Sequence, residues 1–338
     1  MSARRQHVTA GRDTAHLITL SLRAALLGGL LLGTGVVADE ATDVVVTPLG
    51  SHDGEFCARD RAILLQDPDG TRILYDAGRT VAGPDDPRLG EVDVVLVSHL
   101  HGDHVGDVRI AATNEGTCAS PRFGEPLVDT NSAEIAAGKG ATMVTGSEMP
   151  PFLAGKLESA GGDPELSRLV RFGGSIDIGG VAITTVPATH SNGIEGSLIG
   201  GELGKMLDAA GITAYAGPPT GYVLTFSNGL VVYLSGDTGI TSEQRTTVAD
   251  YYEASLVVMN IGDGFTTGPH EAAYVINKLI EPASVIASHA NEEATRDGEL
   301  IGGTRTETFI DAVETDVHVP LSGVPMHFGG DGVCTKGC

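Results

Sequence analysis

The segment Ser98-His99-Leu100-His101-Gly102-Asp103-His104 decides which fold and chemistry this sequence predicts. It follows directly on the apolar run 92–97, which predicts a strand buried on both faces. Alternate residues of an extended segment face the same way, so His99 and His101 can bind one cation. Asp103 and His104, where the chain turns toward a helix, can then face a second cation. The segment therefore predicts two neighbouring half-sites for divalent metal ions.

The half-sites still lack ligands, and three later residues can supply them because each follows a predicted strand. They are His190 after 181–187, Asp237 after 230–235 and His289 after 285–288. Sites in layered α/β folds assemble where strands end, so these side chains are expected to meet the first segment. The seven residues divide into two sets of three, with one carboxylate left to bridge the two ions.

The rest of the chain predicts strands and helices in mixed order. Apolar runs bounded by Gly- and Asp-rich turns predict strands at 44–46, 61–66, 71–75, 92–98, 181–187, 222–226, 230–235, 255–261 and 284–288. Helical patterns cover 131–139, 149–160 and 269–279. This order predicts α/β layers around one core. The polar or Gly-rich stretches 112–130 and 193–220 are expected to be loops that border the site.

The His-x-His-x-Asp-His segment, with His, Asp and His downstream at this spacing, resembles the metallo-β-lactamase fold superfamily. The resemblance implies an α/β fold in the form of a four-layer αββα sandwich, with residues 39–338 as one hydrolase domain. It implies one metal ion held by His99, His101 and His190. It implies a second ion held by Asp103, His104 and His289, with Asp237 bridging the two.

Five further segments are similar to one branch of that superfamily, the uncharacterised metal-dependent hydrolases related to ascorbate-6-phosphate lactonase and the N-acylethanolamine phospholipases. They are Gly173-Gly174-Ser175, Thr189-His190-Ser191, Ser235-Gly236-Asp237-Thr238-Gly239, Ala287-Ser288-His289 and the run 261–269. True β-lactamases resemble the chain less, so a β-lactam hydrolase is the alternative within enzymes. Some relatives of this fold hold di-iron centres, so a redox or non-catalytic metal-binding module is the alternative from another class.

A metal centre of this composition favours hydrolysis. Two divalent cations, two carboxylates and one hydroxide leave a single positive charge, which stabilises a substrate oxygen as it becomes anionic. Metal coordination lowers the pKa of water from 15.7 to roughly 7 and so supplies hydroxide at neutral pH. We therefore expect a metal-bridging hydroxide that cleaves an ester, lactone or phosphodiester.

Two residues are expected to be catalytic, Asp103 and Asp237. Asp237 bridges the ions, and Asp103 orients the nucleophile or passes its proton to the leaving group. The expected cofactors are two divalent metal ions. Zinc is the first expectation, and manganese or iron also suit His and Asp ligands.

The charge of the chain limits its partners. Its 338 residues include 44 Asp and Glu against 21 Lys and Arg, for a formal net charge of −23. Few basic groups are left to neutralise phosphates, which excludes ordinary electrostatic binding to nucleic acid or to an anionic membrane face. The expected partner is a small-molecule substrate, and the sequence does not specify an oligomeric state.

Residues 1–38 have the layout of a secretory signal peptide. Four arginines against one aspartate precede the uncharged stretch 24–38, which is too short to span a bilayer and ends in Val36-Val37-Ala38. We expect cleavage near Asp39, no stable membrane span afterwards, and a mature protein in the periplasm or outside the cell. The pair Arg4-Arg5 leaves open a twin-arginine or a general secretory route, and an uncleaved membrane anchor is the remaining alternative.

Four cysteines, Cys57, Cys118, Cys334 and Cys338, accompany this export signal. An even set in an oxidising compartment favours two disulfides over metal ligation. The sequence leaves three pairings open. We favour Cys57 with Cys118 and Cys334 with Cys338, because the last two share a Gly-containing tail that can close a small loop.

Two polar residues outside the ligand set admit two interpretations each. Asp263 lies in a Gly-flanked turn, where it either orients a ligand histidine or serves the turn alone. His270 follows Pro269 at a predicted helix start, where it either supports a metal ligand or contacts the substrate, or else caps the helix or lies in solvent. The pair His270-Glu271 also stands where the resembled branch leads us to expect acidic residues.

Overall fold

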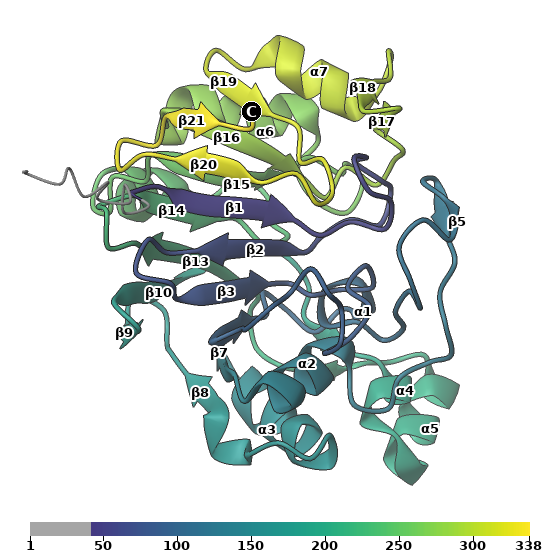
Figure 1. The fold of residues 1–338 in the computed structure, drawn as a ribbon. Coiled ribbons are helices and arrows are strands. Elements are labelled where there is room, and N and C mark those ends of the chain that lie inside the picture. Colours follow the sequence, from purple (N-terminus) through teal and green to yellow (C-terminus); the bar gives the residue numbers. More distant parts are fainter. Residues whose placement is uncertain (1–41) are drawn as a thin grey trace, which may run out of the picture. The chain divides into compact units, whose positions relative to one another are not determined.

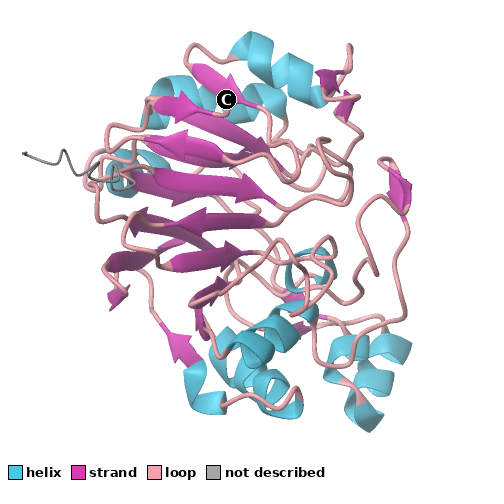
Figure 2. Ribbon diagram, in the orientation of Figure 1, coloured by secondary structure: helices cyan, strands magenta, loops and turns pink. Residues whose placement is uncertain are grey.

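Two β-sheets packed face to face form the centre of the computed structural model, which describes residues 42–338 (Figures 1 and 2). The first sheet has eight strands in the order β21 (Cys334–Lys336), β20 (Met326–Phe328), β1 (Val44–Pro48), β2 (Ile63–Gln66), β3 (Arg72–Tyr75), β4 (Val94–Leu96), β7 (Thr142–Thr145) and β8 (Ser167–Leu169). The second has seven strands in the order β19 (Asp316–His318), β16 (Ser284–Ser288), β15 (Leu256–Asn260), β14 (Val231–Leu234), β13 (Thr220–Thr225), β10 (Val181–Pro187) and β9 (Ser175–Ile178).

Helices and short two-stranded ribbons complete the described part of the chain. The helices are α1 (Gly102–Val105), α2 (Asn131–Lys139), α3 (Met149–Ser159), α4 (Gly196–Ile199), α5 (Gly201–Ala210), α6 (Pro269–Tyr274) and α7 (Arg305–Ala312). A 3-10 turn covers Pro164–Leu166, and π-helical turns cover Gln244–Ala249 and Val275–Ile280. The ribbons pair β5 (Gly116–Thr117) with β6 (Ser120–Pro121), β11 (Gly193–Ile194) with β12 (Ala214–Tyr215), and β17 (Thr295–Arg296) with β18 (Glu299–Leu300).

The core between the sheets is built from alternate residues of the strands. In β1, Val44 and Val46 are fully buried in this core, whereas Val45 and Thr47 are half-buried. Successive side chains of a strand point to opposite faces, so this alternation gives β1 one apolar side for the opposite sheet. The second sheet contributes side chains such as Tyr222 and Leu224 to the same core.

The outer face of each sheet is covered by helices, which gives four layers. On the first sheet, Leu64 and Val95 pack in one cluster with Leu153 of α3. On the second sheet, Val257 packs in another cluster with Phe309 of α7. Full burial of each such side chain contributes about 1.5–3 kcal/mol to folding. The expected four-layer αββα sandwich is therefore confirmed, and β4 is buried on both faces as the run 92–97 predicts.

Each sheet contains a set of parallel strands. In the first sheet, β3, β4, β7 and β8 run parallel to one another. In the second sheet, β14, β15, β16 and β19 do the same. The carboxyl ends of parallel strands meet at one edge of a sheet, so the loops that follow them lie side by side.

Predicted elements match the structure closely where local patterns are strong. Helix α2 at Asn131–Lys139 and strand β10 at Val181–Pro187 have the predicted bounds. The prediction of a loop over 193–220 is wrong, because this stretch forms β11, α4, α5 and β12. Its glycines serve close packing: a Cβ atom on Gly196 would collide with the carbonyl oxygen of Gly204. The stretch 112–130 is irregular apart from the β5–β6 ribbon.

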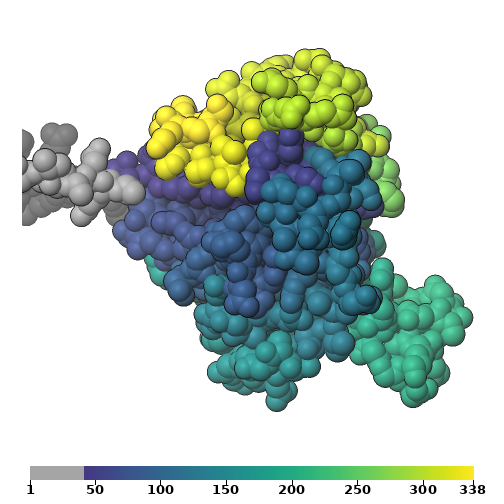
Figure 3. Space-filling model, turned by 45° about the vertical axis from the view of Figure 1, so that its right-hand side comes forward, coloured from purple at the N-terminus to yellow at the C-terminus, as the bar shows by residue number. Residues whose placement is uncertain are grey.

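The α4–α5 segment stands out from the neighbouring described surface at the lower right of Figure 3, where its residues are coloured green-teal. Leu203 and Met206 of α5 are exposed to solvent there.

Among residues 42–338, no helix is both long and apolar enough to cross a membrane. The signal-peptide prediction falls on residues 1–38, which lie outside the described residues.

Two disulfides link the four cysteines. Cys57 pairs with Cys118 and Cys334 with Cys338, with Cα–Cα distances of 4.8 and 6.4 Å. This is the pairing that the sequence favoured. A ring nitrogen of His318 lies within 4.8 Å of both sulfurs of the second pair. Because those sulfurs are bonded to each other, they do not serve as thiolate ligands for a metal ion.

Candidate metal centre

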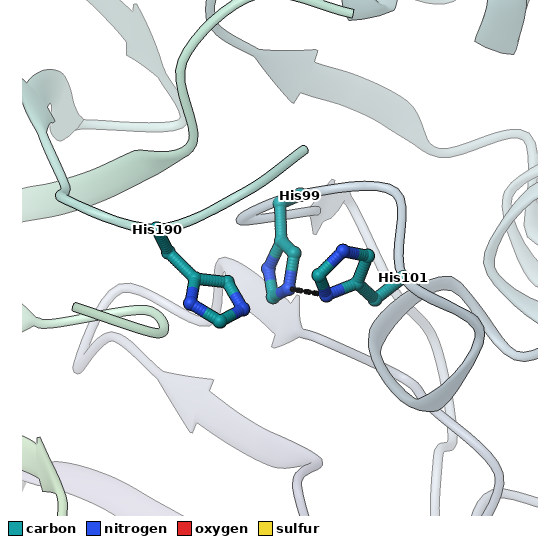
Figure 4. Close-up of side chains that lie close together, drawn as sticks. All are labelled: His99, His101 and His190. Atoms are coloured by element: carbon teal, nitrogen blue, oxygen red, sulfur yellow. Dashed lines mark hydrogen bonds between the residues drawn. The ribbon is translucent and has the colours of Figure 1, made fainter. Parts of the chain in front are cut away.

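Three histidines from two distant segments converge at the edge of the sandwich (Figure 4). His99 and His101 follow β4, and His190 follows β10. Nε2 of His99 lies 2.9 Å from Nδ1 of His101. The ring centroid of His190 lies 5.1 Å from the centroids of both other rings. One nitrogen from each ring lies within 4.8 Å of the others, so this first group can offer three nitrogen ligands to one cation.

A second group lies beside the first and contains a carboxylate. Asp103 and His104 belong to the short helix α1, and His289 follows β16. Oδ2 of Asp103 lies 3.7 Å from Nε2 of His104 and 3.5 Å from Nε2 of His289. The two imidazole rings stack with their centroids 5.2 Å apart. This second group can offer two nitrogens and one oxygen to another cation.

Asp237 lies between the two groups. Its Oδ2 is 3.7 Å from Nε2 of His190 and 4.0 Å from Nε2 of His99. The same oxygen is 3.4 Å from Nε2 of His104 and 3.1 Å from Nε2 of His289. A carboxylate in this position can bridge two cations. The structure thus brings all seven predicted residues together, as two sets of three with one carboxylate between them.

Local backbone contacts hold the loops that carry His190 and Asp237. The Thr189 N–H donates to Thr238 Oγ1 at 3.0 Å, which joins the two loops next to both side chains. Gly236, just before Asp237, has a φ of +60°, a conformation that favours glycine. A Cβ atom on Gly236 would also lie only 2.9 Å from a backbone carbonyl oxygen. The Gly-Asp pair therefore lets β14 end close to the segment that contains His99.

Several buried polar atoms of the centre have no hydrogen-bond partner within residues 42–338. They are Nε2 of His104, Oδ1 of Asp237 and both ring nitrogens of His289. Each unsatisfied buried group costs about 1–3 kcal/mol, so a cluster of them is unfavourable unless something else binds there. Divalent cations bind imidazole nitrogen and carboxylate oxygen, and zinc, manganese and iron all accept such ligands. The residues present therefore fit two divalent metal ions.

The surroundings set the protonation states that metal binding requires. Burial lowers the pKa of His99 well below its usual value, and also lowers those of His101 and His190. Burial opposes ionisation of Asp237, but the imidazoles of His289 and His104 hold the pKa of Asp237 well below the usual range. Burial would likewise lower the pKa of His104, but nearby carboxylates, Asp237 foremost, raise it well above its usual value. A metal ion therefore competes with a proton at His104.

Asp76 supports His104 and was missed by the sequence predictions. It is buried and follows β3 directly. The His104 Nδ1 lies 2.8 Å from Asp76 Oδ2, and Ser98 donates its backbone N–H to Oδ1 at 2.8 Å and its hydroxyl to Oδ2 at 2.7 Å. A carboxylate that accepts a hydrogen bond from one ring nitrogen leaves the other nitrogen free to bind metal. Its position at a strand end is the signal that could have identified it.

Arg61 is a second supporting residue that the sequence predictions missed. Its guanidinium is buried and donates to Asp103 Oδ2 from Nε and Nη2, both at 3.3 Å. It also donates to the Asn291 side-chain oxygen at 2.6 Å. Arg61 therefore fixes the carboxylate of the second group. Nothing local in the sequence distinguishes it from an ordinary arginine at the start of a strand.

A cavity of about 350 Å³ opens beside the two groups. His101, Asp103, His190, Asp237 and His289 all line it. Its rim also includes Arg59, Arg79, Glu195 and Phe265. A small molecule that enters this cavity meets both groups at once.

Comparison with known proteins places this geometry in a family. A family model described as a beta-lactamase superfamily domain matches residues 71–290, which include all seven residues of the centre. The chain belongs to the beta-lactamase superfamily. This membership accounts for the agreement between the sequence-predicted ligand set and the observed cluster.

Relatives in the superfamily are similar to about two thirds of this chain. One is a "UPF0173 metal-dependent hydrolase" from Roseiflexus castenholzii, which is 31% identical over 67% of this chain and 77% of the relative's length. Another from Chloroflexus aurantiacus carries the same name and is 33% identical over 67% of this chain and 77% of that protein. The resemblance to a branch of metal-dependent hydrolases is therefore confirmed.

Among solved structures, this superfamily member is similar to Igni18, described as a novel metallo hydrolase from Ignicoccus hospitalis. The TM-score is 0.55 at 20% identity, over 85% of this chain and 98% of that one. At this level of identity the similarity shows a shared fold. It supports the sandwich described above.

For Asp263 and His270, which each had two interpretations in this superfamily member, the structure supports the one without a role at the metal centre. Asp263 is exposed, and its side chain accepts from the Gly264 N–H at 2.7 Å within its own turn. His270 is exposed at the start of α6 and does not line the cavity. Asp263 therefore serves its turn, and His270 lies in solvent.

Gly262 sets the position of His289, which leads to a first prediction. A Cβ atom on Gly262 would lie 2.5 Å from the His289 carbonyl oxygen and 2.9 Å from its Nδ1. A Gly262→Ala protein is therefore expected to displace His289 and to lower metal affinity at the second group by about 10–100-fold, as loss of a supporting contact does. Chelator competition measures this affinity.

Gly239→Ala is the matched control for that substitution. A Cβ atom on Gly239 would meet no atom within 4 Å, although this residue also lies next to the centre. The control is expected to bind metal as the unmodified protein does. Equal affinities in both variants would show that Gly262 does not position His289.

Proposed function

We propose that this chain is an exported hydrolase that binds two divalent metal ions, zinc first among them, and cleaves an ester, lactone or phosphodiester of a small molecule. The observation that carries the proposal is the position of Asp237. Its Oδ2 lies within 4.0 Å of imidazole nitrogens from both groups, so that seven ligands can serve a pair of cations. Relatives named as metal-dependent hydrolases support the same reaction class.

Bound as a pair, the divalent ions would supply hydroxide at neutral pH and polarise the bond under attack. The two carboxylates differ in exposure, which suggests different roles for them. The Asp237 side chain is 5% exposed, so it serves to bind the ions. The Asp103 side chain is 25% exposed and lines the cavity, so it can contact the attacking water.

Asp103 is suited to orienting the nucleophile. Burial alone would raise its pKa, but His104, His289 and the guanidinium of Arg61 hold that pKa well below the usual range. An ionised carboxylate accepts a hydrogen bond at neutral pH and carries no proton to donate. We therefore assign the Asp103 carboxylate to orienting the nucleophile ahead of protonating the leaving group.

Two features support export. The Cys57–Cys118 and Cys334–Cys338 disulfides are of the kind that persists in oxidising compartments. The layout of residues 1–38 is that of a secretory signal. The proposed location is the periplasm or the outside of the cell.

A single preparation tests the proposal. The full chain is expressed in a bacterium, the exported form is purified without added metal, and its metal content is measured by elemental analysis. A panel of esters, lactones, phosphodiesters and β-lactams is then assayed before and after chelation. We expect two divalent ions per chain and hydrolysis of a member of the first three classes, lost with chelation and restored by zinc.

Other outcomes overturn particular parts of the proposal. Undiminished hydrolysis by metal-free protein would remove the metal mechanism. Redox-active iron with no hydrolysis would support the di-iron alternative, and turnover of β-lactams alone would support a lactamase. Retention of the unprocessed chain inside the cell would contradict export.

A further inference from the structure

Arg59 is a cation at the rim of the cavity that has no carboxylate within ion-pair distance among residues 42–338. Its side chain is exposed and lines the same cavity as His101 and His190. Among the described residues, none forms an ion pair with it within 4.0 Å, although Arg61, two positions on, pairs with Asp103. The guanidinium of Arg59 is therefore available to a bound molecule.

The other arginine that lines the cavity, Arg79, already has a partner. Arg79 donates to both oxygens of Asp107, at 2.6 and 2.8 Å. Glu195 lies near enough for its charge to act on the same Arg79 guanidinium. A substrate that enters the cavity therefore meets Arg59 as its uncompensated positive charge outside the metal centre.

The backbone around Arg59 is held firmly. The Cys57–Cys118 disulfide crosses this segment, and the Ala58 N–H donates to the Cys118 carbonyl oxygen at 3.2 Å. The buried carboxylate of Asp60 accepts from the backbone N–H groups of Ser51 at 2.9 Å and Cys57 at 2.8 Å. Burial raises the pKa of Asp60 to about 6, so burying this carboxylate has a cost.

The exposure pattern shows what this arrangement presents to solvent. Every residue from 56 to 61 is buried except Arg59. A disulfide and a buried carboxylate thus fix a short segment whose one exposed side chain lies on the cavity rim. Fixing the backbone in advance lowers the entropy cost of binding a ligand there.

We propose that Arg59 binds an anionic group, a carboxylate or a phosphate, that the substrate carries apart from the bond that is cleaved. The proposal rests on the function proposed above and narrows its substrate class. A formal net charge of −23 repels anions at long range, so an anionic substrate needs a local cation. Arginine suits this role because its planar fork matches the geometry of carboxylates and phosphates.

The test compares matched substrates on the metal-loaded protein. They share one reactive ester or lactone and differ in a distal carboxylate, phosphate or neutral methyl amide. An Arg59→Ala protein is expected to raise KM about tenfold for the two anionic substrates, as loss of a partly exposed charged hydrogen bond would. Its kcat/KM for the neutral substrate is expected to stay unchanged.

Arg59→Lys and Arg168→Ala complete the set of variants. Lysine keeps the charge without the fork and is expected to recover part of the loss. Arg168 on β8 is exposed and, among the described residues, forms no ion pair, so its removal is expected to change neither substrate class. The distal anion that gives the lower KM with the unmodified protein identifies the group that Arg59 binds.

A binding measurement separates failure of this proposal from failure of the proposed function. Calorimetry measures the affinity of the distal-carboxylate and distal-phosphate products for loaded protein, with and without Arg59. Suppose that the unmodified and Arg59→Ala proteins both hydrolyse the substrates, prefer the anionic ones to the same degree and bind the products equally well. That result would overturn the role of Arg59 and leave the proposed function standing. If the unmodified protein hydrolyses none of the substrates, the proposed function fails, and a tenfold loss of product affinity on removal of Arg59 would still support its anion site.

Discussion

An Asp237→Ala protein is expected to lose hydrolysis by on the order of a thousandfold and to hold at most one metal ion per chain. Asp237 Oδ2 contacts imidazoles of both groups, with separations from 3.1 to 4.0 Å. Its removal takes one ligand and one negative charge from both ions together. Five closely spaced imidazoles would then surround two cations with Asp103 as the only remaining carboxylate ligand, and that arrangement opposes binding of the second ion.

The experiment measures metal content and hydrolytic rate on the same sample. Asp237→Asn is expected to have an intermediate effect, because asparagine keeps the shape and one oxygen of the side chain but removes its charge. Asp311→Ala is the control, since Asp311 lies exposed on α7 away from the cavity. A protein without Asp237 that kept both ions and its full hydrolytic rate would rule out a bridging role for this carboxylate.

The convergence of the seven residues could be predicted because one rule applies to them: in layered α/β folds, sites assemble where strands end. His190, Asp237 and His289 each follow a strand of apolar residues, and strands are recognised from short runs of sequence. Parallel pairing with β15 places the ends of β14 and β16 at one edge, and β10 ends at the same edge because it is antiparallel to β13, which is antiparallel to β14. The rule needs no knowledge of loop conformation, which is why distant segments could be joined from the sequence alone.

Supporting residues could not be predicted in the same way. Arg61 acts through contacts with Asp103 and Asn291, which are 42 and 230 positions away in the chain. Its role depends on the packing of segments whose relative placement no local pattern specifies. Asp76 differs from Arg61 because it directly follows a predicted strand, so the strand-end rule extends to it.

The α4–α5 segment shows a different limit of prediction from sequence, that of intrinsic helix propensity. Glycine disfavours helix by about 1 kcal/mol relative to alanine, so the Gly-rich stretch 193–220 predicts a loop. In the structure, Gly196 and Gly204 lie in α4 and α5 and allow the two helices to approach closely. Tertiary contact outweighs intrinsic propensity here, and a single sequence does not reveal that contact.

Asp76→Asn is expected to lower metal affinity at the second group by about 10–100-fold while the protein stays folded. The side-chain oxygen Oδ2 lies 2.8 Å from His104 Nδ1, so as an acceptor it favours a proton on that nitrogen and leaves Nε2 as a ligand. An asparagine amide can instead donate to Nδ1. The ring proton then moves to Nε2, which can no longer bind a metal ion.

The backbone at this position tolerates the change. Asp76 has a φ of +41°, in the region where asparagine and aspartate occur more readily than other residues with a side chain. The asparagine oxygen can still accept from the Ser98 N–H, which donates to Oδ1 of Asp76 at 2.8 Å. Asp76→Asn should therefore change the tautomer of His104 and leave the backbone conformation unchanged.

Two measurements on metal-free and metal-loaded protein check this expectation. Nitrogen NMR of the imidazole rings reports which nitrogen of His104 carries the proton, and chelator competition reports affinity. Asp67→Asn is the matched control: Asp67 is also buried and accepts from the Ser227 N–H and hydroxyl at 2.8 and 2.7 Å, but those partners lie outside the metal centre. Both variants should lose stability through a weakened buried hydrogen-bond network, and only Asp76→Asn should change the ring proton and weaken metal binding. Equal metal affinity in the two variants would mean that Asp76 stabilises the fold without selecting the ligand nitrogen of His104.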